Sequence, residues 1–240
     1  MKNRTPLILA IVAGVLLVAV IVALVLAFTR PGTEAAVPPA PTTSAPQTPT
    51  PRPTPSASAS PDAVGEPVAI EFAGTGFALV DDKGRAAFTF AWRDEVAAAV
   101  AALTDAFGAA PTQRVEPGDG SHYPDYTVYQ WNGFMLFDMI PTPGGSTRAE
   151  YPQPTYVLFS RAEVGGIRLV AERGLEIGMT VDAVRAASPD LELPRGNVGA
   201  IRFVFDRARS TGVDPLQYSL FADTDGTVVT AILYYLYSEL

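Results

Sequence analysis

The sequence predicts a membrane-anchored α+β protein in which short helices pack on one face of an antiparallel sheet. Three features predict it: an apolar run near the N-terminus, a proline-rich stretch after it, and a remainder in which strand, helix and antiparallel meander occur twice. The chain has 240 residues, no cysteine, one histidine and a net charge of -8. These counts exclude disulfide frameworks and thiolate metal sites, and the acidic balance argues against nucleic-acid binding.

Residues 7–28 form an apolar segment without a charged side chain. A bilayer core of about 30 Å needs about 20 helical residues, so this segment predicts a transmembrane helix after a short tip at residues 1–6. The alternative is a cleaved signal peptide, whose apolar region is shorter, about 7–15 residues. Lys2 and Arg4 precede the span and one positive charge closely follows it, so we expect a cytoplasmic N-terminus and an extracytoplasmic C-terminal domain.

Residues 29–62 are rich in Pro, Ser and Thr, with ten prolines between positions 31 and 61. Proline removes backbone donors and disfavours helix in the preceding residue, so this segment cannot form a packed core. We expect a disordered linker with polyproline II character that holds residues 63–240 away from the membrane. A ligand for an SH3-type domain is the weaker alternative, because such domains are cytoplasmic.

The first half of the folded part begins with strands and continues into a helix. We expect strands at 67–73, 77–80 and 86–91, the last two joined by a turn at residues 82–84. Residues 93–107 have high helix propensity, and the acidic residues at the start of this segment suit the helix dipole. We expect Gly108 to end the helix, because glycine readily adopts the left-handed conformation found at helix C-termini.

The strongest hairpin signal is Asn132-Gly133, between the apolar segments 126–131 and 134–139. This dipeptide favours a type I′ turn, in which both central residues have positive φ. A two-residue turn pairs Trp131 with Phe134, Tyr129 with Leu136 and Val128 with Phe137. Because both faces of the hairpin are apolar, we expect it to be central in its sheet or covered on both sides.

The second half repeats this order in a shorter form. We expect strands at 167–172, 200–205, 216–222 and 228–237, with a tight turn at Asp225-Gly226. Thr180 is placed to cap a helix over residues 181–187. The repeat makes 63–165 and 166–240 possible subunits of the folded domain.

The segment Leu169–Ala187 (LVAERGLEIGMTVDAVRAA) resembles a pattern in small exported domains of high-GC Gram-positive bacteria. In BamE/SmpA-like lipoproteins and in β-lactamase-inhibitor-like repeats, a strand similarly leads through a Gly-containing turn into a short helix. The resemblance implies helices packed on a small antiparallel sheet and an extracytoplasmic location. It implies no catalytic residues, because Gly174, Gly178 and Thr180 have structural roles in the pattern, and this chain lacks the acylated cysteine of the lipoproteins.

The histidine, His122, lies in a Gly- and Pro-rich loop near Asp119, Ser121 and Asp125. A catalytic triad needs a base placed in space between nucleophile and orienting group, which neighbours along a loop do not supply. We therefore expect no catalytic role for His122.

The segment from Asp223 to Gly226 is similar to the opening of a calcium loop, but the sixth and twelfth positions are Val228 and Tyr234 rather than Gly and Glu. It predicts a β-turn. Three acidic residues, Asp94, Glu95 and Asp105, could pair with other carboxylates for glycosidic chemistry if the fold brought them together. We predict no catalytic residue, no cofactor and no metal site.

Aromatic residues gather between positions 123 and 156. Tyr126, Tyr129, Trp131 and Phe134 form a possible binding surface, since aromatic side chains anchor interfaces. The alternative, which we favour, is that they belong to the core of a sheet. The sequence thus predicts a membrane-tethered extracytoplasmic domain with a non-enzymatic binding or envelope-associated role.

The alternative function is an extracytoplasmic, carboxylate-dependent hydrolase acting on cell-wall polymer. The expected partners are the membrane, through residues 7–28, and an unknown envelope protein or wall polymer. Nucleic acid is not among them.

Overall fold

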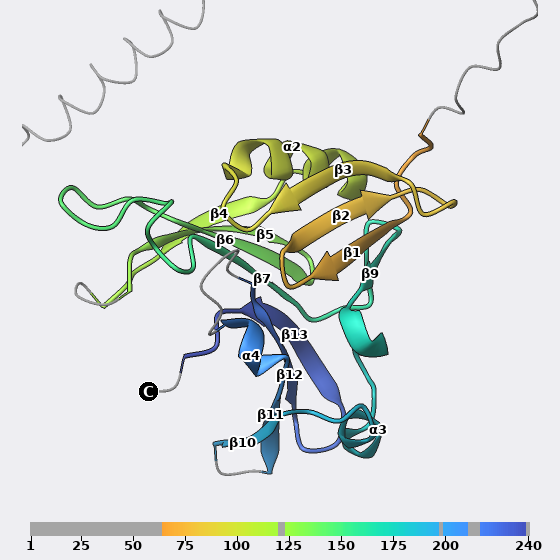
Figure 1. Cartoon of the computed structure of the whole chain (residues 1–240). Coiled ribbons are helices and arrows are strands. Elements are labelled where there is room, and N and C mark those ends of the chain that lie inside the picture. Colours follow the sequence, from red (N-terminus) through yellow and green to blue (C-terminus); the bar gives the residue numbers. More distant parts are fainter. Residues whose placement is uncertain (1–63, 120–122, 197–198, 211–216, 239–240) are drawn as a thin grey trace, which may run out of the picture. The chain divides into compact units, whose positions relative to one another are not determined.

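The computed structural model describes residues 64–119, 123–196, 199–210 and 217–238 (Figure 1). The predicted transmembrane helix at 7–28, the linker at 29–62 and His122 lie outside these residues. Within the described ranges, no helix has the length and apolar character needed to cross a membrane. Residues 58–240 form one compact unit, to which every described residue belongs.

The first of two sheets has five strands in the order β3-β2-β1-β9-β8. Its strands are β1 (Ala69–Ala73), β2 (Gly76–Val80), β3 (Ala86–Ala91), β8 (Glu163–Val164) and β9 (Ile167–Val170). The β1–β9 pair is parallel, whereas the other pairs are antiparallel. This sheet therefore joins segments that lie about one hundred residues apart in the chain.

The second sheet has eight strands in the order β10-β11-β12-β13-β7-β6-β5-β4, all antiparallel. Its first meander comprises β4 (Thr112–Glu116), β5 (Tyr126–Trp131), β6 (Phe134–Met139) and β7 (Thr155–Phe159). Its second comprises β10 (Leu191–Arg195), β11 (Ala200–Phe205), β12 (Ser219–Thr224) and β13 (Val229–Tyr235). The last strands of the two meanders pair with each other, with Val157 opposite Tyr234 and Phe159 opposite Ile232.

A helix precedes each meander, α2 (Val96–Phe107) the first and α3 (Val181–Ala186) the second (Figure 1). The prediction of an α+β fold in which helix and meander occur twice is therefore confirmed. The prediction of one sheet with helices on one face is corrected, because a second sheet of five strands provides much of the cover. The two meanders also share one sheet, so 63–165 and 166–240 are halves of one folded unit.

Helix α2 begins at Val96, three residues later than predicted, with Glu95 in an extended conformation at its N-cap. It ends as predicted at Gly108, which has a φ of 68°. Its buried residues recur every three or four positions and so form one face: Val96, Ala99, Leu103 and Phe107. The Phe107 ring lies 5.4 Å from that of Trp131, which places this face against the eight-stranded sheet.

The main core lies between the two sheets. From β1, the Phe72 ring contacts the rings of Phe134 on β6, Phe159 on β7 and Tyr234 on β13, at centroid distances of 5.0–6.0 Å. Trp92 stacks on Tyr218 at 5.2 Å and donates from its indole N–H to the Gly74 carbonyl. Residues of both halves thus pack into one hydrophobic core.

The predicted hairpin has the predicted register, with Trp131 opposite Phe134 and Val128 opposite Phe137. Both of its strands lie in the interior of the sheet, and each face of the hairpin carries buried side chains. The predicted type I′ turn is wrong, because Gly133 has a positive φ of 101° and Asn132 does not. A Cβ at Gly133 would meet the Arg161 side chain at 2.6 Å, so close approach also favours glycine there.

The second half carries short helical turns. As predicted, the Thr180 hydroxyl caps α3 by accepting a hydrogen bond from the Ala183 N–H at 3.3 Å. A 3-10 turn, η1 (Glu172–Gly174), precedes α3, and α4 (Arg207–Ser210) follows β11.

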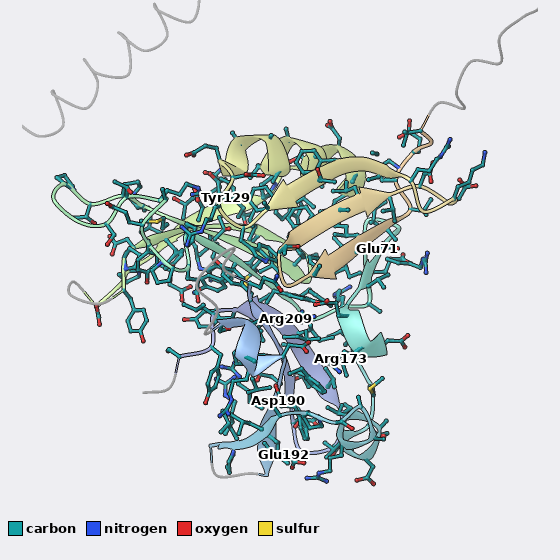
Figure 2. All side chains as sticks on the ribbon, viewed as in Figure 1. Glu71, Tyr129, Arg173, Asp190, Glu192 and Arg209 are labelled. Atoms are coloured by element: carbon teal, nitrogen blue, oxygen red, sulfur yellow. The ribbon has the colours of Figure 1, made fainter. Side chains whose placement is uncertain are left out.

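Ion pairs join η1 to α4. Arg209 pairs with Glu172 at 2.7 Å, and Arg173 pairs with Asp206, the residue before α4. Figure 2 labels the two arginines. Arg173 and Asp206 both have positive φ, at 60° and 55°. Each of the two carboxylates therefore has an arginine partner, and this cluster holds the two turns together.

We expect Trp131→Ala to lower the free energy of unfolding by about 3–5 kcal/mol, because it removes a large ring that is 5% exposed. The matched control is Tyr123→Ala, at an aromatic residue that is 46% exposed, and its effect should stay within about 0.5 kcal/mol. Chemical denaturation of a protein comprising residues 63–240 measures both. An unchanged unfolding midpoint for Trp131→Ala would show that the ring is not part of the core.

Candidate functional site

The eight-stranded sheet has an inner face toward the five-stranded sheet and an outer face that points away from it. Two smaller hydrophobic clusters lie on the outer face, one around Val128 and Phe137 and the other around Val204, Phe221 and Leu233. Of the described residues outside the sheet, Tyr151 and Tyr237 pack on these clusters. Helix α4 (Arg207–Ser210) packs on this face at β12, where the buried Ser219 hydroxyl contacts the Ser210 hydroxyl and donates to the Asp206 carbonyl. Over the remainder of the face, no described helix or strand forms a second layer.

A row of aromatic rings crosses the outer face. Tyr156 on β7 stacks on Phe137 of β6, with centroids 4.1 Å apart and planes within 8° of parallel. The rings of Tyr126 and Tyr235 pack nearly perpendicular to that of Tyr156, with centroids 5.2 and 5.0 Å away. Phe221 continues the row at 6.0 Å from Tyr235. We call these five residues the aromatic row, which spans β5, β6, β7, β13 and β12.

Burial makes the hydroxyl groups of two tyrosines of the row, Tyr126 and Tyr156, harder to ionise by raising the pKa of each. Burial raises the pKa of Tyr156 well above its usual value, and the neighbouring Tyr235 adds to the rise. Burial also raises the pKa of Tyr126, whose hydroxyl donates to the Gln153 carbonyl at 2.8 Å. Tyr126 is almost fully buried, whereas Tyr156 and Tyr235 remain partly exposed.

Charged side chains lie at both ends of the aromatic row. At the β4 end, Arg114 pairs with Glu116 at 3.2 Å. At the β11 end, Arg202 makes two hydrogen bonds of 2.6 Å to Asp223 and lies over the Phe221 ring at 5.4 Å. The outer face therefore has an aromatic and aliphatic centre and a charged rim.

The four residues of the sequence-predicted surface do not lie on one face. Trp131 and Phe134 are buried on the inner face, and Tyr129 is partly buried on the same side. Tyr126 is on the outer face and 7% exposed. These positions favour the core interpretation of the aromatic residues.

The surface predicted from the sequence omitted the partly exposed members of the row, although Tyr156 belongs to the aromatic group between positions 123 and 156. Tyr156 and Tyr235 lie in the strands TYVLF and VTAILYY, where they occupy the side opposite to the most deeply buried residues. The alternation of side chains along each strand predicts the face on which each tyrosine lies. The two tyrosines become neighbours only because β7 pairs with β13.

A separate polar cluster lies at one end of the inner face, where Arg148 pairs with Asp138. Arg148 also donates to the carbonyls of Arg93 and Asp94 at 3.1 Å, and its Nε lies 4.0 Å from the Glu95 carboxylate. Burial raises the pKa of Asp138, and the Arg148 guanidinium opposes that rise. One arginine thus joins the loop before β7 to the start of α2.

The other candidate carboxylates lie elsewhere. Asp105 is ten residues beyond Glu95 on α2, about 15 Å along the helix axis. Asp225 accepts hydrogen bonds from the N–H groups of Thr227 and Val228, so its segment is a turn, as predicted. Among the described residues, no three His, Asp or Glu side chains are grouped to hold a metal ion.

Buried Asp81 organises the turn between β2 and β3. It accepts hydrogen bonds from the N–H groups of Gly65, Lys83 and Arg85 and pairs with the Arg85 side chain. These bonds, above all that from Gly65, hold the pKa of Asp81 well below its usual value.

An open hollow of about 470 Å³ lies on the five-stranded sheet. Its lining includes Glu71, which is labelled in Figure 2. Its lining includes many small side chains, among them Ala73, Thr75, Ala78 and Thr89. Asp94, also in the lining, accepts a hydrogen bond from the Ala91 N–H. The polar side chains of its lining are those of Glu71, Thr75, Thr89 and Asp94, and the remainder of the lining is apolar or glycine.

No family model matches this chain, and no curated protein or solved structure matches it. The resemblance of Leu169–Ala187 to BamE/SmpA-like and β-lactamase-inhibitor-like domains remains a prediction. No residue role is therefore transferred from a relative.

We expect Arg148→Met to raise the pKa of Asp138 further, because the carboxyl stays partly buried and loses its cation. The folded pKa then lies further above the unfolded value of about 3.9. The stability deficit of the variant should therefore be smallest at pH below 3.9 or so and grow as pH rises through the folded pKa.

Carbon-13 NMR titration of the Asp138 carboxyl measures this pKa directly, and denaturation at several pH values measures the deficit. Asp105→Asn is the control, because Asp105 is an exposed carboxylate of α2 that does not contribute to the Asp138 pKa, so it should leave both nearly unchanged. A lower Asp138 pKa in Arg148→Met would contradict the ion-pair assignment.

Proposed function

We propose that this chain is a membrane-tethered extracytoplasmic protein that binds a protein partner of the cell envelope, without catalysis, through the outer face of its eight-stranded sheet. The observation that carries the proposal is the aromatic row with its charged rim. Protein interfaces combine an apolar, aromatic-rich centre with a polar rim, and Tyr and Arg are enriched among the residues that contribute most to binding.

The tether is supported by the sequence. Residues 7–28 have the length and apolarity of a membrane span, with Lys2 and Arg4 on the side expected to be cytoplasmic. The proline-rich residues 29–62 supply a spacer that gives the folded domain reach beyond the bilayer surface.

A protein partner is favoured over a wall polysaccharide by the packing of the rings. A sugar stacks on an exposed ring face, but one face of Tyr156 is covered by Phe137. Two further rings, those of Tyr126 and Tyr235, pack nearly perpendicular to Tyr156, so three rings surround it, and the aliphatic Leu158 packs on the same cluster. A face of this kind fits the side chains of another protein.

The alternative function is a carboxylate-dependent hydrolase of wall polymer. Its best candidate pair is Asp138 and Glu95, but the Arg148 guanidinium contacts both carboxylates. A cation held between them occupies the position that a substrate would need. This geometry is that of a structural ion pair and favours the binding function.

Site-directed cross-linking tests the proposed binding face. Because the chain has no native cysteine, a single introduced cysteine is the only thiol that can be labelled in it. In the full chain, Ala231→Cys places one thiol on the outer face, and Thr89→Cys places one on the exposed side of the five-stranded sheet as a control. Intact protoplasts are treated with a membrane-impermeant maleimide that carries a photoactivated group, and are then illuminated.

We expect both variants to be labelled, and Ala231→Cys to give a discrete protein adduct that is absent from Thr89→Cys. Adding Leu158→Lys should reduce this adduct at least tenfold, because it places a charge at the centre of the face. Labelling only after lysis would contradict the orientation. If both variants were labelled but gave equal adducts, the outer face would not be the binding surface. An adduct with wall polymer alone would contradict the proposal that the partner is a protein.

A further inference from the structure

The two sheets have four edge strands, and three of them carry features that prevent further pairing. Strand β8 has two residues, β10 contains Pro194, and β3 has a register shift against β2. Very short strands, proline and bulges are among the devices by which proteins block sheet edges, as are charged side chains, of which β4 carries one of each sign. Strand β4 has none of the three and pairs regularly with β5 over five residues.

All five residues of β4 are exposed, and Val115 is 58% exposed. Among the described strands, β5 is the sole partner of β4, so the other edge of β4 faces no described strand. An unpaired edge of this length presents backbone N–H and C=O groups to any strand that matches it. The side chains of β4 decide which strand that is.

The charges of β4 complement those of a second β4 strand. Arg114 and Glu116 lie on the same side of the strand, on either side of Val115. If two copies pair antiparallel about a two-fold axis at Val115, Arg114 of each copy lies opposite Glu116 of the other. Opposite charges in directly facing positions stabilise an antiparallel pair, and the two Val115 side chains meet on the other side.

We propose that two copies of this chain associate through antiparallel pairing of their β4 strands, centred on Val115, which joins their eight-stranded sheets into one continuous sheet. The neighbouring register, centred on Arg114, would place two arginines opposite each other and is disfavoured. Because the two-fold axis is normal to the sheet, the outer faces of both copies lie on the same side. The pairing stands on β4 alone and does not depend on the proposed function.

Cysteine cross-linking in the full-length, membrane-embedded chain tests this pairing. Facing residues of an antiparallel pair have Cα atoms about 4.5–5.5 Å apart, within the range that a disulfide spans. Val115→Cys should therefore form a disulfide-linked dimer under mild oxidation. In Gln113→Cys, the matched control, the two cysteines would lie four residues out of register, about 14 Å apart along the strand.

We expect the dimer to form at least tenfold faster from Val115→Cys than from Gln113→Cys on non-reducing gels. Adding Glu116→Arg to Val115→Cys should remove most of this advantage, since it places arginines opposite each other. Exchanging both charges, Arg114→Glu with Glu116→Arg, should restore it. Equal rates for Val115→Cys and Gln113→Cys, or rates that do not respond to the charge changes, would overturn the proposal.

Discussion

The pairing of β7 with β13 is the constraint on which the rest of the structure depends. Among the described strands, it is the one strand pairing that joins the two meanders into the eight-stranded sheet. Because of it, residues of both halves line one inner face, and Phe72 from β1 can contact rings on β6, β7 and β13. Either half alone would expose a sheet edge and part of this core to water, at a large cost in hydrophobic free energy.

Local signals in the sequence predicted much of the fold. The hairpin register at Asn132-Gly133, the Gly108 helix end and the Thr180 cap all depend on residues near one another in the chain. Strands β4 and β10 were missed because their sequences, TQRVE and LELPR, are mostly exposed and lack the apolar alternation of a half-buried strand. The five-stranded sheet was missed because its parallel pair joins distant segments, which no local pattern reveals.

The candidate site shows the same limit. Sequence clustering grouped Tyr126 with Trp131 and Phe134, but the alternation of side chains along a strand sends them to opposite faces. The aromatic row instead joins Tyr126 and Tyr156 of the first half to Tyr235 and Phe221 of the second. Such a surface exists only after the two meanders have paired, and its members are too far apart in sequence to form a motif.

Native-state hydrogen exchange on residues 63–240 tests most directly whether the β7–β13 pairing makes the two halves one cooperative unit. The account predicts that the slowest amides of α2, β6, β7, β12 and β13 all exchange with the same free energy, equal to that of global unfolding. Exchange of β12 and β13 at a distinctly lower free energy, while β6 stays protected, would show that the second half opens independently. That result would contradict the shared core as the basis of the fold.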